Sequence, residues 1–219
     1  MYGLKDNVAR KAGTMGKEEN KEMEFWTQEE FQAFLECVAD KPISYYAFEM
    51  LYWSGIRDGE LLALTPADFN FEKKTLRINK SYQRLEGKDV ITDPKTPKSN
   101  RTIVMLDFLT IEMEDFIKSI YGIKMDDRIF TISKSYLHHE MDRGAKLAGV
   151  KRIRIHGLRH SHISLLINLE FSALAIGERV GHEAVDITYH YAHLFPTVQT
   201  DMAAQLETER EALVNVRKE

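Results

Sequence analysis

Hydrophobic residues recur at helical spacing over most of this chain. Thr27 and Glu30, three residues apart, form a capping box, which is typical of the start of a helix. The apolar series that follows them is Phe31, Phe34, Leu35 and Val38. Because residues three and four apart share one face of a helix, this series predicts an amphipathic helix over about 27–39.

The same periodicity continues beyond this first helix. It predicts a second helix over 43–54 that stops at Gly55, and a short third helix that Asp58 caps and Pro66 ends. Further helices are expected at about 107–121, 135–148, 157–169, 172–179, 184–191 and 198–216.

One stretch between the helices alternates instead. Leu76 and Ile78 alternate with polar residues, while Gly87 and Pro97 mark turns. This pattern predicts a three-stranded antiparallel meander at about 74–83, 88–95 and 101–106. The expected fold class is therefore α+β: one mainly helical domain with a small three-stranded antiparallel sheet.

Composition narrows the class of protein further. The chain has 219 residues, of which 43% are apolar, enough for one substantial core. Residues 1–25 are polar and aperiodic, which indicates a linker or the remnant of a connection to another domain. A lone Cys37 excludes an internal disulfide, and the lack of a long apolar run excludes a membrane span. Together with the lack of an apolar signal segment, these features favour a cytoplasmic protein.

The formal net charge of −4 argues slightly against a nucleic-acid partner, but the distribution of charge changes that picture. Nine basic residues against four acidic ones lie between Glu72 and Arg101, and seven against two lie between Lys134 and Arg159. A basic stripe on an acidic body binds polyanions. Two ordinary solvated faces are the alternative.

Several cationic side chains stand at predicted helix starts. Arg57 lies between two helices, where its guanidinium would either grip two phosphate oxygens or pair only with Glu60. His156 and Arg159 lie three residues apart at another helix start, as an anion site or as a surface pair.

Tyr191 lies nine residues after His182, in the run Tyr189–His193. A phenol with a pKa of about 10 is a poor nucleophile at neutral pH unless nearby cations stabilise its phenolate. Without such cations, Tyr191 would be a packing residue.

Taken together, these segments resemble the catalytic domain of the tyrosine recombinase, or phage integrase, family. They look most like the integrases of conjugative transposons and Gram-positive phages. Their order and spacing are family-like over about residues 26–195. The matching segments are Ser54–Leu61, Pro94–Thr96 with Arg101–Ile103, His156–His160, Gly181–His182 and Tyr191–His193.

The resemblance implies a site-specific DNA recombinase that integrates or excises a mobile element. It would break and rejoin DNA through a 3′-phosphotyrosyl link, without ATP, cofactor or metal, because the protein–DNA ester conserves the bond energy. Its implied catalytic residues are Arg57, Lys95, His156, Arg159, His182 and Tyr191.

Each of these residues takes a role from the resemblance. Tyr191 would be the nucleophile, and the charge on the phosphate would be met by two arginines and one histidine, namely Arg57, Arg159 and His182. Lys95 would be the general acid, with Lys98 as its fallback, and His156 a base or hydrogen-bonding assistant. Glu60 would orient Arg57. Candidates for contacts with backbone phosphates are Arg77, Arg84, Lys88, Lys98 and Arg101.

The resemblance also implies partners and domains. Residues 26–196 would be the catalytic domain, which in this family usually follows a core-binding domain. Residues 197–219 would be a helical tail of the kind that members exchange between protomers. The resemblance implies that the partner is double-stranded DNA with specific recombination sites. It also implies a tetramer on that DNA, a monomer when the protein is free, and accessory DNA-bending or excision factors.

Two positions depart from the commoner family pattern. Gly157 stands where the family usually has Asp, and Glu170 stands where a glycine is frequent. A non-glycine residue at a helix end has to accept a left-handed backbone conformation. Neither departure removes a catalytic group.

Two other classes of function stay open. One is a non-catalytic DNA-binding module derived from an integrase, which keeps only the basic stripe. The other is a metal-dependent hydrolase, suggested by the eight histidines. Arg159 lies where a zinc-binding helix has a neutral spacer, and no Glu follows His156, so this second class is disfavoured.

Overall fold

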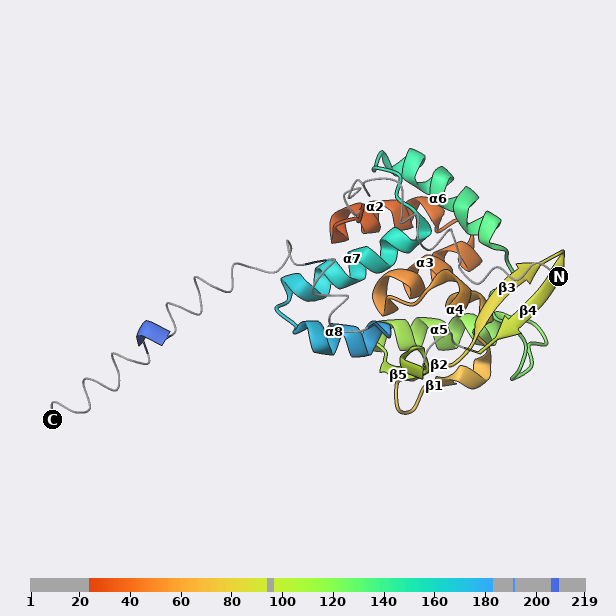
Figure 1. Ribbon diagram of the computed structural model, residues 1–219. Coiled ribbons are helices and arrows are strands. Elements are labelled where there is room, and N and C mark those ends of the chain that lie inside the picture. The colour runs from red at the N-terminus through yellow and green to blue at the C-terminus, as the bar shows by residue number, and fades with distance from the viewer. Residues whose placement is uncertain (1–23, 94–96, 183–190, 192–205, 209–219) are drawn as a thin grey trace, which may run out of the picture.

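The computed structural model describes residues 24–93, 97–182, 191 and 206–208. Figure 1 shows helices packed around a central α3, with the strands along one side. The helices are α2 (Gln28–Val38), α3 (Pro42–Ser54), α4 (Asp58–Ala63), α5 (Asp107–Ser119), α6 (Lys134–Ala148), α7 (Ile155–Asn168) and α8 (Ala173–Val180). The strands are β1 (Phe69–Asn70), β2 (Thr75–Ile78), β3 (Ser81–Leu85), β4 (Lys88–Thr92) and β5 (Arg101–Val104).

The predicted helices up to residue 180 are confirmed, with bounds that differ by at most two residues. The capping box is present, since the Glu30 carboxylate accepts the N–H of Thr27 at 2.9 Å and the Thr27 hydroxyl accepts the N–H of Glu30 at 3.3 Å. The cap of α4 differs from the prediction, because Arg57 rather than Asp58 is the N-cap residue. The two last predicted helices lie outside the described residues, apart from Tyr191 and 206–208, which are helical.

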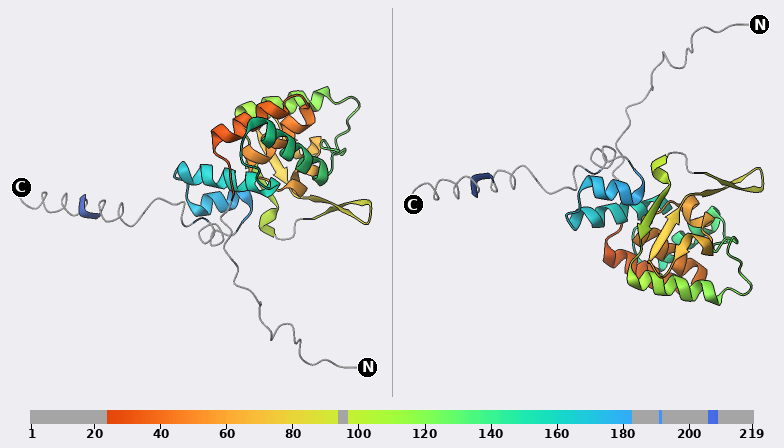
Figure 2. Two further views of the ribbon diagram at one scale, coloured as in Figure 1. Left: turned by 90° about the horizontal axis from the view of Figure 1, so that it is seen from above. Right: turned by 90° about the horizontal axis from the view of Figure 1, so that it is seen from below.

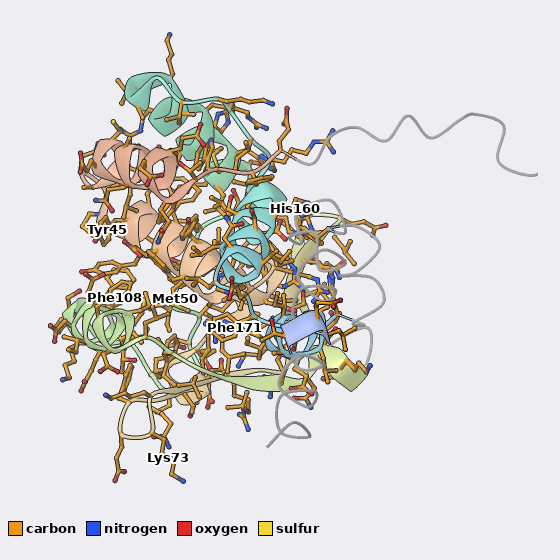
Figure 3. All side chains as sticks on the ribbon, turned by 90° about the vertical axis from the view of Figure 1, so that its left-hand side faces the viewer. Tyr45, Met50, Lys73, Phe108, His160 and Phe171 are labelled. Carbon is orange, nitrogen blue, oxygen red and sulfur yellow. The ribbon has the colours of Figure 1, made fainter. Side chains whose placement is uncertain are left out.

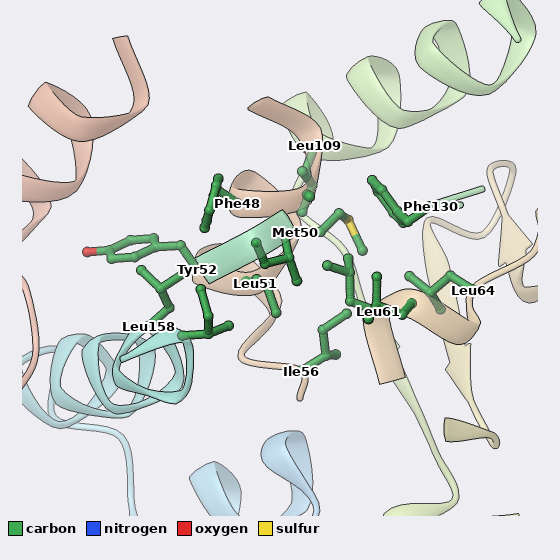
Figure 4. Packing of buried hydrophobic residues seen from close by; sticks show 14 of the residues in the cluster. Phe48, Met50, Leu51, Tyr52, Ile56, Leu61, Leu64, Leu109, Phe130 and Leu158 are labelled. Carbon is green, nitrogen blue, oxygen red and sulfur yellow. The ribbon is translucent and has the colours of Figure 1, made fainter. Parts of the chain in front are cut away.

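The main core forms around α3. This helix is apolar on several sides because α2, α4, α5 and α7 all pack against it. Figure 4 shows its side chains interdigitating with those of α4, α5 and α7. The residues of α3 that are at most 1% exposed and apolar are Ala47, Phe48, Met50, Leu51 and Tyr52. Since burial of one large apolar side chain stabilises a protein by about 1.5–3 kcal/mol, this core fixes the end of α3 and the segment after it.

A small antiparallel sheet is present, but the predicted meander is wrong in its pairing. The sheet has the order β1-β2-β5, with Leu76 opposite Ile103 and Ile78 opposite Arg101. The predicted strand over 74–83 is two strands, β2 and β3, and β3 pairs with β4 in a separate hairpin. Burial alternates through β2 and the first three residues of β3, so the pattern predicted the buried face there while leaving the pairing partner undetermined.

The β3–β4 hairpin extends away from the body of the domain (Figure 2). Its strands are joined by Glu86 and Gly87, which both have positive φ, as a two-residue hairpin turn requires. Most side chains near its tip are exposed. The hairpin therefore presents its basic residues to one side of the domain rather than packing them into the sheet.

A second, smaller core lies between α7 and α8. Its buried members are Ile163, Ile167, Ile176, Val180 and Tyr191. At the other end of α7, Trp26 is buried, and its indole donates to the carbonyl of Lys151 at 2.6 Å. Among the described residues no helix is both long and apolar enough to cross a bilayer.

Candidate active site

Arg159 lies in the first turns of α7 and joins distant segments. The residue is 1% exposed, and its terminal nitrogens donate to the backbone carbonyls of Gly55 and Val180. Gly55 caps the end of α3, two residues before Arg57. Val180 is the last residue of α8, two residues before His182. One buried guanidinium thus holds together two segments that carry other predicted site residues.

The charge of Arg159 survives its burial. Burial lowers the pKa of Arg159 to about 9, and the nearby charge of Arg57 acts in the same direction. This pKa is still above neutral pH, so the guanidinium remains protonated. Its Nε is buried and has no hydrogen-bond partner among the described residues. A buried cation with a spare donor is suited to an anionic ligand.

Arg57 begins α4 and is oriented by Glu60. The Arg57 Nη1 donates to Oε1 of Glu60 at 2.8 Å, and its backbone N–H donates to Oε2 at 2.9 Å. The contact that the i,i+3 spacing predicted is therefore present. The Arg57 side chain stays 33% exposed, so its guanidinium is accessible from solvent.

Two histidines lie within electrostatic reach of both arginines. His156 is exposed at the surface, but desolvation by the protein around it lowers its pKa, and the charges of Arg159 and Arg57 add to the effect. Burial lowers the pKa of His182 to about 3, again with contributions from Arg159 and Arg57. Both imidazoles are therefore neutral at pH 7, and each has one N–H donor and one acceptor nitrogen.

Tyr191 is packed between α7 and α8 and is 2% exposed. Its hydroxyl hydrogen-bonds to Nδ1 of His160. Burial raises the pKa of Tyr191 well above that of a free phenol, and the charge of Arg159 opposes this shift only in part. In the free protein Tyr191 is therefore a neutral phenol.

A cleft of about 720 Å³ opens between α4, the β3–β4 hairpin and the end of α8. Arg57 and His182 line it, whereas Arg159 and Tyr191 are too deeply buried to do so. Four basic side chains of its wall come from three different elements and one loop: Lys80, Arg84, Lys98 and Lys134. The cleft is a cationic groove, because its five basic lining residues outnumber Asp58, Glu60 and Asp93, and it contains Arg57 and the neutral His182.

A sequence profile described as the phage integrase family matches residues 24–197 of this chain. The chain belongs to the phage integrase family. The family-level prediction from the five sequence segments is confirmed.

Individual relatives agree with this membership. The ICEBs1 integrase of Bacillus subtilis is 31% identical over 217 residues, which are 92% of this chain and 58% of that protein. The integrase of Staphylococcus phage L54a is 30% identical over 179 residues, 74% of this chain and 51% of that protein. The chain thus spans between half and three-fifths of the length of these two curated relatives.

Solved structures share the fold. The Tn1549 transposon integrase in complex with transposon right end DNA superposes with a TM-score of 0.71 at 19% identity, covering 90% of this chain and 68% of that one. The catalytic domain of bacteriophage HP1 integrase gives a TM-score of 0.58 at 18% identity, covering 83% of this chain and 95% of that one. The predicted α+β catalytic-domain fold is therefore confirmed.

In this integrase-family fold, most of the predicted catalytic set comes together around the two arginines. Arg57, His156 and His182 each interact electrostatically with Arg159, and so does Tyr191 from the α7–α8 core. Lys95 lies outside the described residues. Its fallback, Lys98, is exposed on the wall of the cleft.

The predicted phosphate contacts divide into two groups. Arg77, Arg84, Lys88 and Lys98 are exposed, as a contact with DNA requires. Arg101 differs from that expectation, because its side chain is 6% exposed and bonded to Glu60. Its position on β5 faces the interior, where a backbone phosphate has no access.

Two residues of the site were not assigned a role from sequence. His160 contacts the Tyr191 hydroxyl, and its ring meets that of His156 edge-on, with 4.8 Å between the ring centroids. The i,i+4 spacing of the two histidines was the available signal. Lys134 lines the cleft and pairs with Asp58 at 3.1 Å, and nothing in the local pattern separates it from other basic residues of its segment.

One of the two departures from the family pattern, Gly157, has a structural reason. A Cβ on Gly157 would lie 2.9 Å from the carbonyl oxygen of Glu24, so the segment before α2 requires a glycine there. Glu170 has φ +63°, the left-handed conformation expected for it.

Among the described residues, no group of three or more His, Cys, Asp and Glu side chains is placed to hold a metal ion.

Proposed function

We propose that this chain carries the active site of a site-specific DNA recombinase. The Tyr191 oxygen attacks a DNA phosphorus, the bond from phosphorus to the 5′ oxygen breaks, and a 3′-phosphotyrosyl link forms. Attack of a 5′-hydroxyl on that link then reverses the steps and rejoins DNA. The observation that carries the proposal is the buried Arg159 guanidinium, which ties the Arg57 and His182 segments together beside Tyr191.

The proposed role of each residue follows from its charge. Arg57 and Arg159 offset the charge that grows on the non-bridging phosphate oxygens, and neutral His182 adds an N–H donor. One well-placed donor of this kind is worth roughly a hundred- to a thousandfold in rate. His156 accepts the phenolic proton, and Lys95, with Lys98 as the fallback, protonates the departing 5′ oxygen.

The buried, protonated Tyr191 corresponds to the state of the enzyme before it binds DNA. Tyr191 is protonated and shielded from water in the α7–α8 core, where it cannot reach a phosphate held in the cleft. We propose that DNA binding brings phosphate, Arg159 and Tyr191 into contact. The phosphate and the arginines together then favour loss of the phenolic proton at the moment of attack.

The partner proposed is double-stranded DNA with specific recombination sites, in the cytoplasm. The Tn1549 integrase was solved in complex with transposon right end DNA, and the similar ICEBs1 and L54a proteins are integrases, which supports integration or excision of a mobile element. A tetramer on DNA, a monomer in its absence, and accessory DNA-bending or excision factors belong to the same proposal. So do the catalytic limits 26–196, the linker before them and the exchanged tail after them.

The test is covalent capture of DNA. A library of nicked duplexes with randomised arms is incubated with the chain in EDTA, and protein-linked DNA is recovered after denaturation and sequenced. The wild type should enrich a defined sequence, Tyr191→Phe should yield no adduct, and Arg159→Lys should lower the adduct rate at least a hundredfold.

Each alternative has its own outcome in this experiment. Enrichment of bound DNA without any adduct indicates the non-catalytic DNA-binding module. Adduct-free DNA cleavage in a parallel incubation with a divalent metal ion in place of EDTA indicates a metal-dependent hydrolase. Either result overturns the proposal, provided that the melting temperature of the protein shows it to be folded.

A further inference from the structure

Arg101 makes an unusual set of contacts for the first residue of an edge strand. Its Nη1 and Nη2 donate to the two carboxylate oxygens of Glu60 at 3.2 and 3.0 Å. Nη1 also donates to the carbonyl of Ser99 at 3.1 Å, and Nε donates to the carbonyl of Arg179 at 2.9 Å. All the nitrogens of this guanidinium therefore bond within the protein.

These bonds reach three separate parts of the site. Glu60 is the carboxylate that orients Arg57. Ser99 directly follows Lys98, at the end of the segment that carries the predicted lysines. Arg179 is in the last turn of α8, three residues before His182. A single side chain thus connects the arginine, lysine and histidine segments of the cleft.

The backbone next to His182 is shaped around the same side chain. Gly181 has φ +71°, and a Cβ there would lie 3.0 Å from Nη1 of Arg101 and 3.1 Å from the carbonyl oxygen of Lys98. The turn that presents His182 therefore rests directly on Arg101. This close approach leaves little freedom for His182 to move independently of the lysine segment.

Arg101 also changes the charge that the cleft presents. Arg57 and Glu60 on their own form a neutral pair. Glu60 is shared between Arg57, whose side chain is 33% exposed, and Arg101, whose side chain is 6% exposed. The buried cation offsets the carboxylate, so the three groups carry a net charge of +1 and the exposed Arg57 keeps its attraction for an anion.

We infer that Arg101 is a positioning residue of the recombination reaction. It holds Arg57, His182 and the lysine segment in one frame, and it offsets the charge of Glu60 so that Arg57 acts on the phosphate as a full cation. This inference rests on the proposed function. It assigns Arg101 an indirect role in place of the direct DNA contact that its sequence position suggested.

The test separates the charge effect from simple loss of structure. The adduct rate is measured at saturating DNA, on the sequence that the wild type selects, for Arg101→Met, Arg101→Lys and the double variant Glu60→Gln/Arg101→Met. Arg101→Met leaves Glu60 free to neutralise Arg57, so its rate should fall roughly tenfold to a hundredfold. The double variant removes the carboxylate charge and should recover roughly tenfold of that loss.

Arg101→Lys keeps the charge but lacks the planar fork, so its rate should lie between those of the wild type and Arg101→Met. The matched control is Arg143→Met. Arg143 also clamps two acidic groups and a backbone carbonyl, those of Glu140, Asp40 and Cys37, but on α6. Its loss should lower the melting temperature without changing the adduct rate of the folded protein.

Two results overturn the inference while leaving the proposed function intact. One is an unchanged rate for folded Arg101→Met. The other is a double variant that is no faster than Arg101→Met, which is the pattern of a purely structural ion pair. If Arg101→Met does not fold, an adduct rate of folded Arg101→Lys equal to that of the wild type overturns the inference. Failure of the wild type itself to form an adduct would refute the proposed function instead.

Discussion

Burial, more than direct pairing with a charged neighbour, sets the protonation states of single residues in this site. Tyr191 is a neutral phenol because the protein around it excludes water, and Arg159 is a cation despite the same exclusion. His182 and His162 are neutral for the same reason. Burial therefore sets a resting state in which His182 and His162 are neutral while the buried guanidinium of Arg159 keeps its charge at physiological pH.

The buried histidines predict a pH dependence of stability. Burial lowers the pKa of His162 from 6.5 to about 3, with Arg179 adding to the shift. Because this folded pKa lies below the unfolded one, the unfolded chain takes up a proton that the folded chain does not, and stability is lost as the pH falls below about 6.5. His162 alone should lower the free energy of unfolding by roughly 1 kcal/mol per pH unit between pH 6 and 4.

Urea denaturation at pH 7, 6, 5 and 4 measures this dependence. His162→Gln keeps an acceptor for the N–H of Arg179, which His162 accepts at 3.0 Å, but it has no titratable group. Its stability should fall less steeply with pH than that of the wild type. Parallel slopes for the two proteins would contradict the assignment.

At the scale of elements, the ends of helices decide where the site residues stand. α3 ends at Gly55 and α8 ends at Gly181, both with left-handed backbone, and each end is followed within two residues by a site residue. α7 ends instead at a left-handed non-glycine, Glu170. The first two ends therefore have the residue that suits their backbone, whereas the third carries strain.

Relief of this strain is a direct prediction. Glu170→Gly should raise the free energy of unfolding by about 1 kcal/mol, since a left-handed conformation costs a non-glycine residue about that much. The matched control is Glu178→Gly, an exposed glutamate within α8, which should lose about 1 kcal/mol. Equal effects of the two glycines in urea denaturation would rule out the strain.

The start of α7 gives a second prediction at this scale. Gly157→Asp, which restores the commoner family residue, places a side chain against the Glu24 carbonyl and Ile153. It should destabilise the chain by about 1–3 kcal/mol and displace the segment that carries Trp26. Thermal unfolding and tryptophan fluorescence measure both effects. Gly122→Asn, in open space, is the control, and a Gly157→Asp protein as stable as the wild type would refute the close approach.

The whole molecule combines a negative net charge with a basic cleft. The net charge is −4, yet basic residues of the hairpin, the β5 approach and α6 all line one groove. Long-range repulsion of DNA by the acidic body and short-range attraction by the groove act together. Affinity for DNA should therefore depend strongly on salt.

Binding to a short duplex should weaken at least tenfold between about 50 and 200 mM salt. Arg84→Gln and Lys98→Gln should each lower the slope of log affinity against log salt by about 1. Lys73→Gln is the matched control, because Lys73 lies at the far end of the molecule from His160 (Figure 3). Fluorescence anisotropy at several salt concentrations measures the slopes, and a salt-independent affinity would contradict the cationic groove.

Local sequence patterns were enough to predict most of the helices and the family to which the chain belongs. Helical periodicity and capping involve residues within four positions of one another, so α2, α3 and α5 to α8 were predictable within two residues. Five short segments, each with its own chemical logic, were enough to identify the family, and they nominated five described residues that the fold brings together: Arg57, His156, Arg159, His182 and Tyr191. Lys95 and the helices after Gly181 stay predictions, since they lie outside or almost wholly outside the described residues.

Tertiary structure decided what depends on distant partners. Arg101 bonds to residues 41 and 78 positions away, so no local pattern distinguishes it from an exposed arginine on a strand. The partner of His160 is 31 positions away, and the split of the predicted strand depends on which of two neighbours pairs with it. The sequence alone determined the elements and the reactive groups, because those are encoded locally. Only the folded chain determined which buried charged and polar groups contact one another, because such contacts depend on distances that the packing of the whole core sets.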